Sequence, residues 1–429
     1  MSMTLVALLG VLCLFLLILL KMPISFAMFM VGFFGMLYMT SPIAAYNVIS
    51  SGIWEQLSGY SLSVIPLFIF MGELLFRSGI TEKIFAAAYA WIGHFRGSMA
   101  TTTILSSAGF AAVSGSNTAT AATVGTIALP EMKKFGYSRA LSAGSVAAGG
   151  TLGVIIPPSS VLIVIALQAE LAIRDLFLAS IVPGLILVVL FIATIGLLCR
   201  RRPDMGPAGV RSSWSVRWRS LKGIIEIGAL FTLVLGGLFA GWFTSTEAAA
   251  VGCIGAMLIT LIQGKLSWAV LSEAIANALK SSAMILMLVA GAVIFGRFLT
   301  ITRLPFMVGE WAAALPLPAI MVMACILLIY VIGGALMDAM GFLIISIPIF
   351  FPVALALGYD PIWFGVVVCI VTSMGAITPP VGVNAFIVKS LDAELRMGET
   401  FRGVGYFIPP YLLCIALLLV IPQLVLFVL

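Results

Sequence analysis

Charged side chains are scarce in this sequence, and their scarcity excludes most soluble architectures. Asp, Glu, Lys and Arg make up 9% of the 429 residues, whereas 62% are hydrophobic. A soluble domain carries roughly 25% charged residues, because its surface faces water. This chain has to place most of its surface in lipid. We therefore expect a polytopic membrane protein built entirely of α-helices.

Histidines, cysteine pairs and nucleotide-binding loops are also missing. The chain has one histidine, His94, and six isolated cysteines without a CxxC pair. It contains neither the HExxH of zinc hydrolases nor the GxxxxGK[ST] loop that binds ATP. A nucleophilic serine would lack the base that it needs. We expect neither an enzyme nor an ATP-driven pump, and no organic cofactor or transition-metal site.

Apolar runs are abundant instead. Ten of them reach the length of about 20 residues that spans the core of a bilayer. They lie at residues 4–20, 24–40, 57–76, 140–168, 176–199, 225–243, 246–263, 276–299, 361–391 and 404–428. Two further apolar regions, 98–135 and 318–357, are interrupted near the middle by Gly, Ser, Thr or Asp. We expect these two to be hairpins that enter and leave the membrane on one side.

The distribution of basic residues predicts the orientation. Lys and Arg concentrate on the cytoplasmic side of membrane proteins. With the N-terminus outside, 19 of the 22 basic residues fall inside, and only Arg174, Arg297 and Arg303 fall outside. Both termini are therefore expected on the outer side of the membrane.

Two proline pairs indicate an internal duplication. The segment "GVIIPPSS" begins at Gly153 and "GAITPPVG" begins at Gly375, so the two segments lie 222 residues apart. In the same register, residues 130–158 and 352–380 match without a gap at eight positions. A chance match of this length and density is improbable, so the chain is expected to consist of two repeats.

The repeats are expected to have opposite orientations in the membrane. Each half, 1–199 and 224–429, contributes five crossings and one hairpin, and an odd number of crossings turns the second copy upside down. Inverted repeats with broken helices are typical of secondary transporters. The linker, 200–223, is most simply a basic cytoplasmic loop, although Trp214 and Trp218 suit contact with anionic headgroups.

Each proline pair is expected to break its helix and release carbonyl groups. Pro157 and Pro158 have no N–H to donate, so the carbonyls near Gly153 and Val154 should lose their helical partners. Oxygen atoms are the ligands that hard cations prefer. The hydroxyls of Thr151, Ser159 and Ser160 lie close enough in sequence to complete a sodium shell.

The hairpin tips are expected to supply the remaining ligands. The first tip, "SGSNTAT", packs hydroxyls and an amide into residues 114–120, and the second, "IGGALMDAMG", carries the intramembrane carboxylate Asp338. New helix N-termini at these breaks favour an anionic substrate. Small residues can also serve helix packing alone, but their recurrence opposite both proline pairs favours binding sites.

Three stretches resemble the large membrane subunit of the tripartite ATP-independent periplasmic (TRAP) transporters. They are "SGSNTATAATVGTIALPEMKKFGYS", "GGTLGVIIPPS" and "TSMGAITPPVGVNAFIV", and the resemblance extends over nearly the whole chain. It implies an all-helical elevator transporter driven by sodium, in which hairpins and broken helices slide past a scaffold. It also implies a separate small four-helix membrane subunit and a periplasmic substrate-binding protein. The protein would then lie in a bacterial inner membrane, with both termini in the periplasm.

The resemblance assigns residues to sites by motif. The first sodium site would contain Ser114, Gly115, Ser116, Asn117, Thr151, Gly153 and Pro157. The second would contain Gly333, Gly334, Thr372, Ser373, Gly375 and Thr378, with Asp338 as a further sodium ligand. The substrate would contact Thr118, Ser159, Ser160, Pro380, Gly382 and Asn384.

The expected cargo is a carboxylate, such as sialic acid or a C4-dicarboxylate. Two alternatives stay open at this point. One is a sodium–dicarboxylate elevator that works without a binding protein, and the other is a channel.

Overall fold

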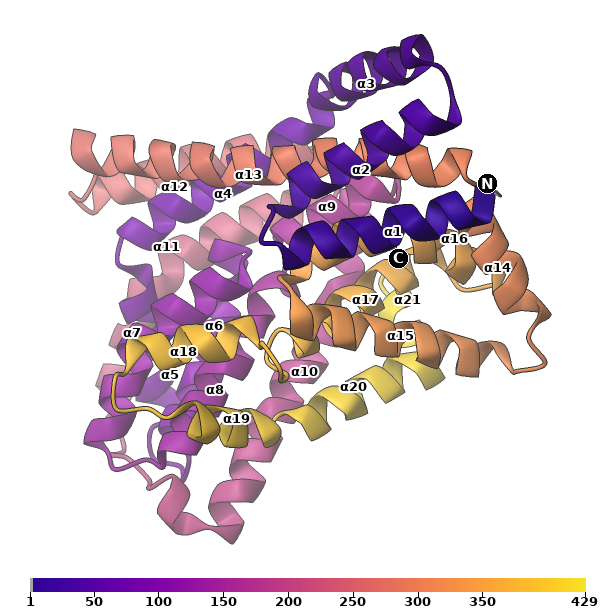
Figure 1. The fold of residues 1–429 in the computed structure, drawn as a ribbon. Coiled ribbons are helices and arrows are strands. Elements are labelled where there is room, and N and C mark those ends of the chain that lie inside the picture. The colour runs from indigo at the N-terminus through magenta and orange to yellow at the C-terminus, as the bar shows by residue number, and fades with distance from the viewer. Residues whose placement is uncertain (1–2) are drawn as a thin grey trace.

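The structure, a computed structural model that describes residues 3–429, is a bundle of helices (Figure 1). The described residues form no sheet beyond one isolated bridge between Arg96 and Ala208. The first helices are α1 (Met3–Leu19), α2 (Ile24–Met39), α3 (Pro42–Leu57), α4 (Val64–Arg77), α5 (Ile80–Ile92), α6 (Ser98–Ser114), α7 (Asn117–Lys134), α8 (Arg139–Thr151), α9 (Ser160–Gln168) and α10 (Ile173–Arg201).

The second half continues with helices of similar lengths. They are α11 (Trp214–Phe239), α12 (Ser245–Ile262), α13 (Trp268–Ile301), α14 (Leu304–Ala314), α15 (Ala319–Leu336), α16 (Ala339–Ala356), α17 (Pro361–Gly375), α18 (Val383–Leu391), α19 (Met397–Gly405), α20 (Ile408–Val420) and α21 (Gln423–Leu426). Short 3₁₀ turns lie at Tyr60–Ser63, Leu152–Val154 and Pro203–Met205.

Eight helical segments of the described chain are long and apolar enough to cross a membrane. Six coincide with predicted crossings, and the other two are α15 and α16, the arms of the predicted second hairpin. The structure therefore differs from the ten predicted crossings. Helices α1 and α2 are apolar but have only 17 and 16 residues, and the predicted crossings at 140–168 and 361–391 are each divided by a break.

Three helices have no counterpart among the predicted elements: α3, α5 and α14. They have 16, 13 and 11 residues, and α3 and α5 mix polar with apolar side chains, so a search for spanning runs misses them. The last predicted crossing, 404–428, is also divided into three helices. Prolines stand at the first turns of its second and third helices, which suits a chain that restarts there.

The two halves repeat the same order of elements and exchange equivalent contacts. The series α4 to α9 and the series α13 to α18 each consist of two successive helices, a two-helix hairpin and a divided helix. Helix α2 packs on α13 while α12 packs on α4, and α7 packs on α18 while α16 packs on α9. Reciprocal contacts of this kind are what a two-fold relation between equivalent units produces.

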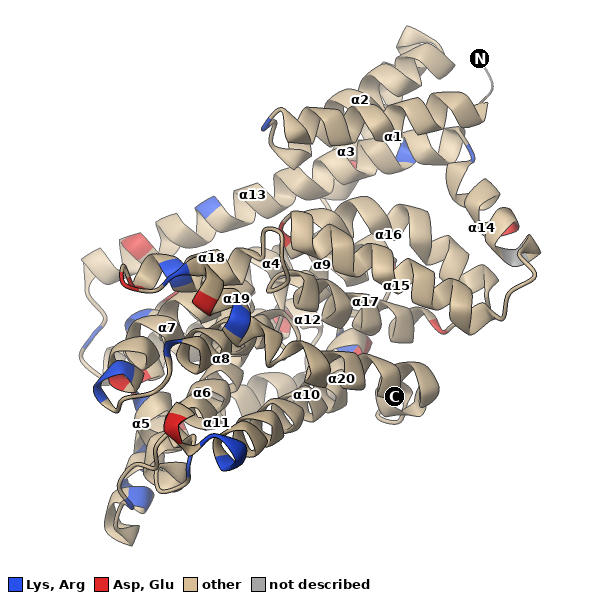
Figure 2. Cartoon of the chain, turned by 60° about the horizontal axis from the view of Figure 1, so that its bottom comes forward, with Lys and Arg blue, Asp and Glu red and all other residues tan. Residues whose placement is uncertain are grey.

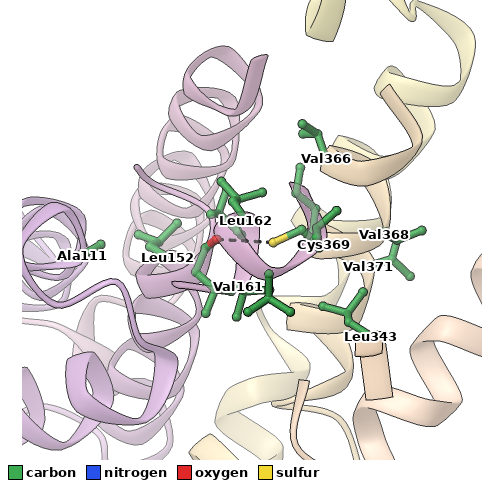
Figure 3. Close-up of a cluster of buried hydrophobic side chains, with 14 of the residues drawn as sticks. Ala111, Leu152, Val161, Leu162, Leu343, Val366, Val368, Cys369 and Val371 are labelled. Carbon is green, nitrogen blue, oxygen red and sulfur yellow. Dashed lines mark hydrogen bonds between the residues drawn. The ribbon is translucent and has the colours of Figure 1, made fainter. Parts of the chain in front are cut away.

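The divided helices meet in the centre of the molecule. Figure 3 shows Val161 and Leu162 of α9 beside Cys369 of α17. These three side chains are at most 3% exposed. This apolar contact fixes the first break against the second half of the chain, and it also leaves little room for water between them.

Charged residues avoid one side of the bundle. Figure 2 shows Lys and Arg gathered near the ends of α5, α7 and α10. Helices α15, α16, α17 and α20 contain no charged residue at all. This distribution is expected of helices that lie within a bilayer and of loops that lie outside it.

Glycines allow α8 and α19 to cross with their backbones in contact. A Cβ on Gly403 would overlap the carbonyl oxygen of Ala140, and a Cβ on Gly144 would overlap the carbonyl of Gly403. Glu394, just before α19, adds ion pairs with Lys133 at 2.8 Å and Arg139 at 3.2 Å. The last part of the chain is thereby held against the first hairpin and the first divided helix.

Substituting Gly403 by Ala is expected to destabilise the protein by about 1–3 kcal/mol, because the added methyl group has to separate two backbones. Gly405→Ala is the matched control, since a Cβ there meets nothing within 4 Å. The midpoint of thermal unfolding in detergent measures both. Equal midpoints for the two variants would contradict the close crossing.

Candidate functional site

At the first break, between α8 and α9, a side-chain hydroxyl replaces the missing backbone hydrogen bond. The hydroxyl of Ser159 accepts from the amide of Leu162 at 3.3 Å, which caps α9, and donates to the carbonyl of Val154 at 2.7 Å. The thiol of Cys369 donates to the same carbonyl at 3.3 Å (Figure 3). The expectation of a free carbonyl at Val154 is therefore wrong. The Ser159 hydroxyl supplies the hydrogen bond that Pro158, four residues after Val154, cannot donate.

Thr151, at the end of α8, is held within the protein interior. Its hydroxyl donates to the carbonyl of Ala148 at 2.6 Å and accepts a short hydrogen bond from the hydroxyl of Tyr411. The residue has no exposed surface. Both hydrogen bonds orient the Thr151 oxygen, and they explain why a polar group is tolerated at this depth.

The tip of the α6–α7 hairpin lies directly against this break. The carbonyl of Gly115 accepts from the amide of Ser160 at 3.3 Å and from its hydroxyl at 2.8 Å. Gly115 has a positive φ of 58°, which suits a residue without a Cβ. A Cβ on Gly153 would overlap the carbonyl oxygen of Ser116. The glycines predicted at this site are therefore required by the close contact between tip and break.

Most hydroxyls at the first tip bond to one another. The oxygens of Ser114 and Thr120 lie 2.7 Å apart, and Thr120 also donates to the carbonyl of Ser116 at 2.7 Å. Asn117 is different. It is 6% exposed, and its Oδ1 has no hydrogen-bond partner among the described residues. A buried amide oxygen without a donor is costly unless a ligand occupies it.

The second tip and the second break repeat this arrangement. The carbonyl of Ala335 accepts from the amides of Val381 at 3.2 Å and Gly382 at 3.4 Å. Gly382 is the residue equivalent to Ser160 in the 222-residue register. A Cβ on Gly375 would meet the backbone of Gly334 at 2.6 Å. Both proline pairs thus lie beside a hairpin tip that is bonded to the residues following them.

The hydroxyls predicted for the second sodium site donate to carbonyls of their own helix. Thr372 donates to Val368 at 2.6 Å, Ser373 to Cys369 at 2.7 Å, and Thr378 to Met374 at 2.7 Å. Such back-bonding satisfies the hydroxyl proton and leaves oxygen lone pairs. Among the described residues, Asp338 is not hydrogen-bonded to any of these three hydroxyls. It caps α16, with its carboxylate accepting from the amide of Met340 at 3.1 Å.

A cavity of about 650 Å³ lies between the two halves of the chain. Six of the predicted site residues line it, and they come from both tips and the first break: Ser114, Ser116, Asn117, Thr118, Ser160 and Asp338. The other predicted residues lie outside its lining: Gly115, Thr151, Gly153, Pro157, Ser159, Gly333, Gly334, Thr372, Ser373, Gly375, Thr378, Pro380, Gly382 and Asn384.

The ionisable side chains that line the cavity are acidic. Glu73 and Asp338 line it, and no Lys, Arg or His does within the described chain. The carboxylate of Glu73 accepts from Asn277 Nδ2 at 3.4 Å and lies 3.9 Å from Nε of Arg77. Arg77 is itself paired with Glu273. Opposing these charges, the N-termini of α7, α9 and α16 border the cavity with their partial positive charge.

Sequence reasoning missed the α4 and α13 side of the cavity. Glu73, Phe76, Ser281 and Met284 all line it. Glu73 had a usable signal, because an acid within an apolar run is a functional candidate in a membrane protein. The others had none, since a single Phe, Ser or Met in a spanning helix does not reveal which face it occupies.

Asn384 lies fully buried between the two halves of the chain. Its Nδ2 donates to the carbonyl of Ala147 at 3.3 Å. Ala147 is equivalent to Cys369 in the internal register, and Cys369 donates to the carbonyl of Val154. Each half therefore provides a side-chain donor to the backbone of the other half, close to the two breaks.

Comparison with known proteins identifies the family. Residues 11–424 match the model of the "Tripartite ATP-independent periplasmic transporter, DctM component". The chain belongs to this family. It is a TRAP transporter large subunit, as the three sequence stretches indicated.

Two relatives of this TRAP large subunit illustrate the range of cargo in the family. The chain is 32% identical to the C4-dicarboxylate TRAP transporter large permease protein DctM of Pseudomonas aeruginosa, over 86% of this chain and 85% of the relative. It is 27% identical to the sialic acid TRAP transporter large permease protein SiaM of Vibrio cholerae, over 94% of this chain and 93% of the relative. Both relatives are permeases.

A solved structure shares the fold of this TRAP subunit. The YdaH transporter of Alcanivorax borkumensis superimposes with a TM-score of 0.63 at 16% sequence identity. The match covers 88% of this chain and 89% of that one. At this identity the likeness shows a common helical architecture and no more.

Replacing Asn384 by Ala is expected to destabilise the subunit by about 1–2 kcal/mol through the lost hydrogen bond. The Oδ1 of Asn384, like that of Asn117, has no hydrogen-bond partner among the described residues. Because Asn384 lies outside the cavity lining, we nevertheless expect the affinity for cargo to stay unchanged. Thermal unfolding and the KM for uptake measure the two effects. Ser390→Ala, at an exposed position of the same helix, is the control. A higher KM with unchanged stability would instead place Asn384 in the cargo site.

Proposed function

We propose that this TRAP large subunit carries out sodium-coupled uptake of an organic acid across the inner membrane by an elevator movement. The observation that carries the proposal is the cavity between the halves, bordered by a hairpin tip whose Asn117 has an unpartnered buried oxygen. Uptake of this kind needs no ATP, and the chain contains no ATP-binding loop.

Oxygen atoms of the right kind for sodium gather at each tip and break. At the first, Ser114 and Asn117 line the cavity, and the backbone of Gly153 lies against the carbonyl oxygen of Ser116. At the second, the hydroxyl oxygens of Thr372 and Ser373 accompany Gly334 and Gly375. A buried oxygen cluster without a competing cation suits a monovalent ion that is bound and released in each cycle.

The reciprocal packing supports two inverted repeats. Helices α2 and α12 pack on α13 and α4 of the opposite halves, as a two-fold axis requires. We propose that this axis lies in the membrane plane, as it does in secondary transporters with inverted repeats. The hairpins and divided helices also contact each other across the halves, since α7 packs on α18 and α16 on α9. We propose that these four elements move together against α4 and α13.

Charge determines when an anion can bind. Two carboxylates line the cavity without a basic residue among the described residues, so an organic acid meets net repulsion there. Bound sodium ions and three helix N-termini would offset it. Cargo affinity is therefore expected to rise with sodium concentration. Two sodium ions entering down about 100 mV and a tenfold gradient supply about 7 kcal/mol for accumulation.

The carboxylate cargo and the partners follow the family. We propose that a periplasmic binding protein delivers the cargo and that a small membrane subunit, a separate four-helix chain, completes the transporter. The family description names a tripartite periplasmic system, and two relatives are named for C4-dicarboxylate and sialic acid. From the distribution of basic residues, we also propose that both termini lie in the periplasm.

Asn117→Ala is expected to raise the sodium concentration for half-maximal uptake about tenfold or more, because the sodium ion loses one of its proposed oxygen ligands, Asn117 Oδ1. Asp338→Ala should weaken sodium coupling in the same assay. Thr126→Ala, on an exposed face of α7, serves as the control. Unchanged sodium activation in Asn117→Ala would remove the first tip from the sodium site, and unchanged activation in Asp338→Ala would remove that carboxylate.

Liposomes that contain this chain together with the small subunit are expected to take up cargo only when the binding protein is added outside and sodium is present. Radiolabelled C4-dicarboxylates and sialic acid are the first cargo candidates. Uptake by the purified chain alone, without binding protein, would instead indicate a stand-alone symporter. Flux that is linear in cargo concentration and independent of sodium would indicate a channel.

A further inference from the structure

The linker between the two halves is folded onto the base of the first hairpin. The amide of Gly97 donates to the carbonyl of Gly206 at 2.9 Å, and the amide of Gly209 donates to the carbonyl of Gly93 at 3.0 Å. Tyr137 donates through its hydroxyl to the carbonyl of Pro207 at 2.8 Å. Burial raises the pKa of Tyr137, so this hydroxyl remains a neutral donor. Residues 203–209 are therefore an ordered part of the molecule.

Arg217 then fixes the start of α11 against α5. It is 6% exposed, and its Nε donates to the carbonyl of Ala90 at 3.2 Å. Its guanidinium carbon lies 5.0 Å from the ring centre of Trp214 and 6.0 Å from that of Trp91. The rings of Trp91 and Trp218 make an edge contact at 5.8 Å. This arginine has a structural role, so its charge is not available to a partner.

The length of α11 places its first turns at headgroup level. The helix has 26 residues, which corresponds to about 39 Å at 1.5 Å per residue, whereas the hydrocarbon core is about 30 Å thick. Roughly six residues therefore extend beyond the core. Trp214 and Trp218 lie among them, and each is 61% exposed in spite of its contact with Trp91. Exposed tryptophans are typical of the boundary between membrane and water.

Basic residues surround these two tryptophans. Arg96, Arg200, Arg201, Arg202, Arg211, Arg219 and Lys222 are all exposed. None of the seven belongs to an ion pair within residues 3–429, where the pairs involve Arg77, Lys133 and Arg139. Asp204 is the one acid between residues 200 and 222. Figure 2 shows several basic positions on the ribbon at this end of the molecule, near α5, α10 and α11.

We propose that this surface, the linker platform, binds the anionic phospholipid headgroups of the surrounding bilayer. The platform consists of Arg96, Arg200–Arg202, Arg211, Arg219 and Lys222 around Trp214 and Trp218. Three features favour a membrane surface as its occupant: the headgroup depth, the positive charge without internal partners, and aromatic rings that remain half exposed. The platform is held rigidly at the base of the first hairpin, so it needs little ordering before lipid binds.

Spin-labelled lipids test this proposal with the full chain in bilayers. The fraction of motionally restricted label gives the association constant of phosphatidylglycerol relative to phosphatidylcholine. In the R202Q/R211Q/R219Q variant, the association constant of phosphatidylglycerol relative to phosphatidylcholine is expected to fall by fivefold or more. Each surface charge contributes roughly a factor of five, so the loss of even one effective contact gives this change. The R202K/R211K/R219K variant keeps the charge and should keep the preference. High salt should weaken it in the unchanged protein.

A matched control removes the same charge elsewhere. Arg174, Arg297 and Arg303 are exposed and lie outside the platform, and R174Q/R297Q/R303Q should leave the lipid preference unchanged. Equal losses in the two Gln variants would overturn the proposal in favour of a general charge effect. Displacement of the labelled lipid by glycerol phosphate would overturn it in favour of a free-anion site, and displacement by an acidic peptide would do so in favour of a protein partner.

Discussion

The contact between each hairpin tip and the break opposite it is the constraint on which the site depends. A proline pair removes amide protons from a buried helix, and lipid offers no replacement. The chain solves this locally with Ser159, whose hydroxyl satisfies Val154, and then brings the hairpin tip in close enough for Ser160 to bond to Gly115. Polar backbone can lie at this depth because protein, and not acyl chains, surrounds it.

Much of the fold follows from hydropathy and from the internal register. Spanning helices, the two reversals near Gly115 and Asp338, and the two breaks all leave strong signals, because each needs a specific residue type: apolar side chains, glycine or proline. Helices α3, α5 and α14 leave weak signals, since each is shorter than the run of about 20 residues that spans a bilayer. Eight identical positions at a constant spacing predict the repeat. The reciprocal packing of the two halves is visible only in the three-dimensional structure.

The candidate site was predictable in kind and less so in detail. Ser114, Asn117 and Asp338, which line the cavity, could be proposed because polar residues at a hairpin tip in lipid are rare. The hydrogen bonds of Ser159 to Val154 and Leu162 could not be predicted, since sequence cannot distinguish a hydroxyl that satisfies its own backbone from one that awaits a ligand. Glu73 was not predicted, because it lies in a continuous helix, and the predicted sites were sought where helices are broken. Side-chain direction and depth decide such cases, and both are tertiary properties.

The length of helix α13 makes its orientation depend on the thickness of the bilayer. Its 34 residues make a rod of about 51 Å, which is too long to stand upright in a hydrocarbon layer of about 30 Å. It has to lean or to reach into the aqueous phase, and it packs against α2, α3 and α4 along the way (Figure 1). Where the helix leans, a change in bilayer thickness changes its tilt, and with it the wall of the cavity that Ser281, Met284 and Ile285 form.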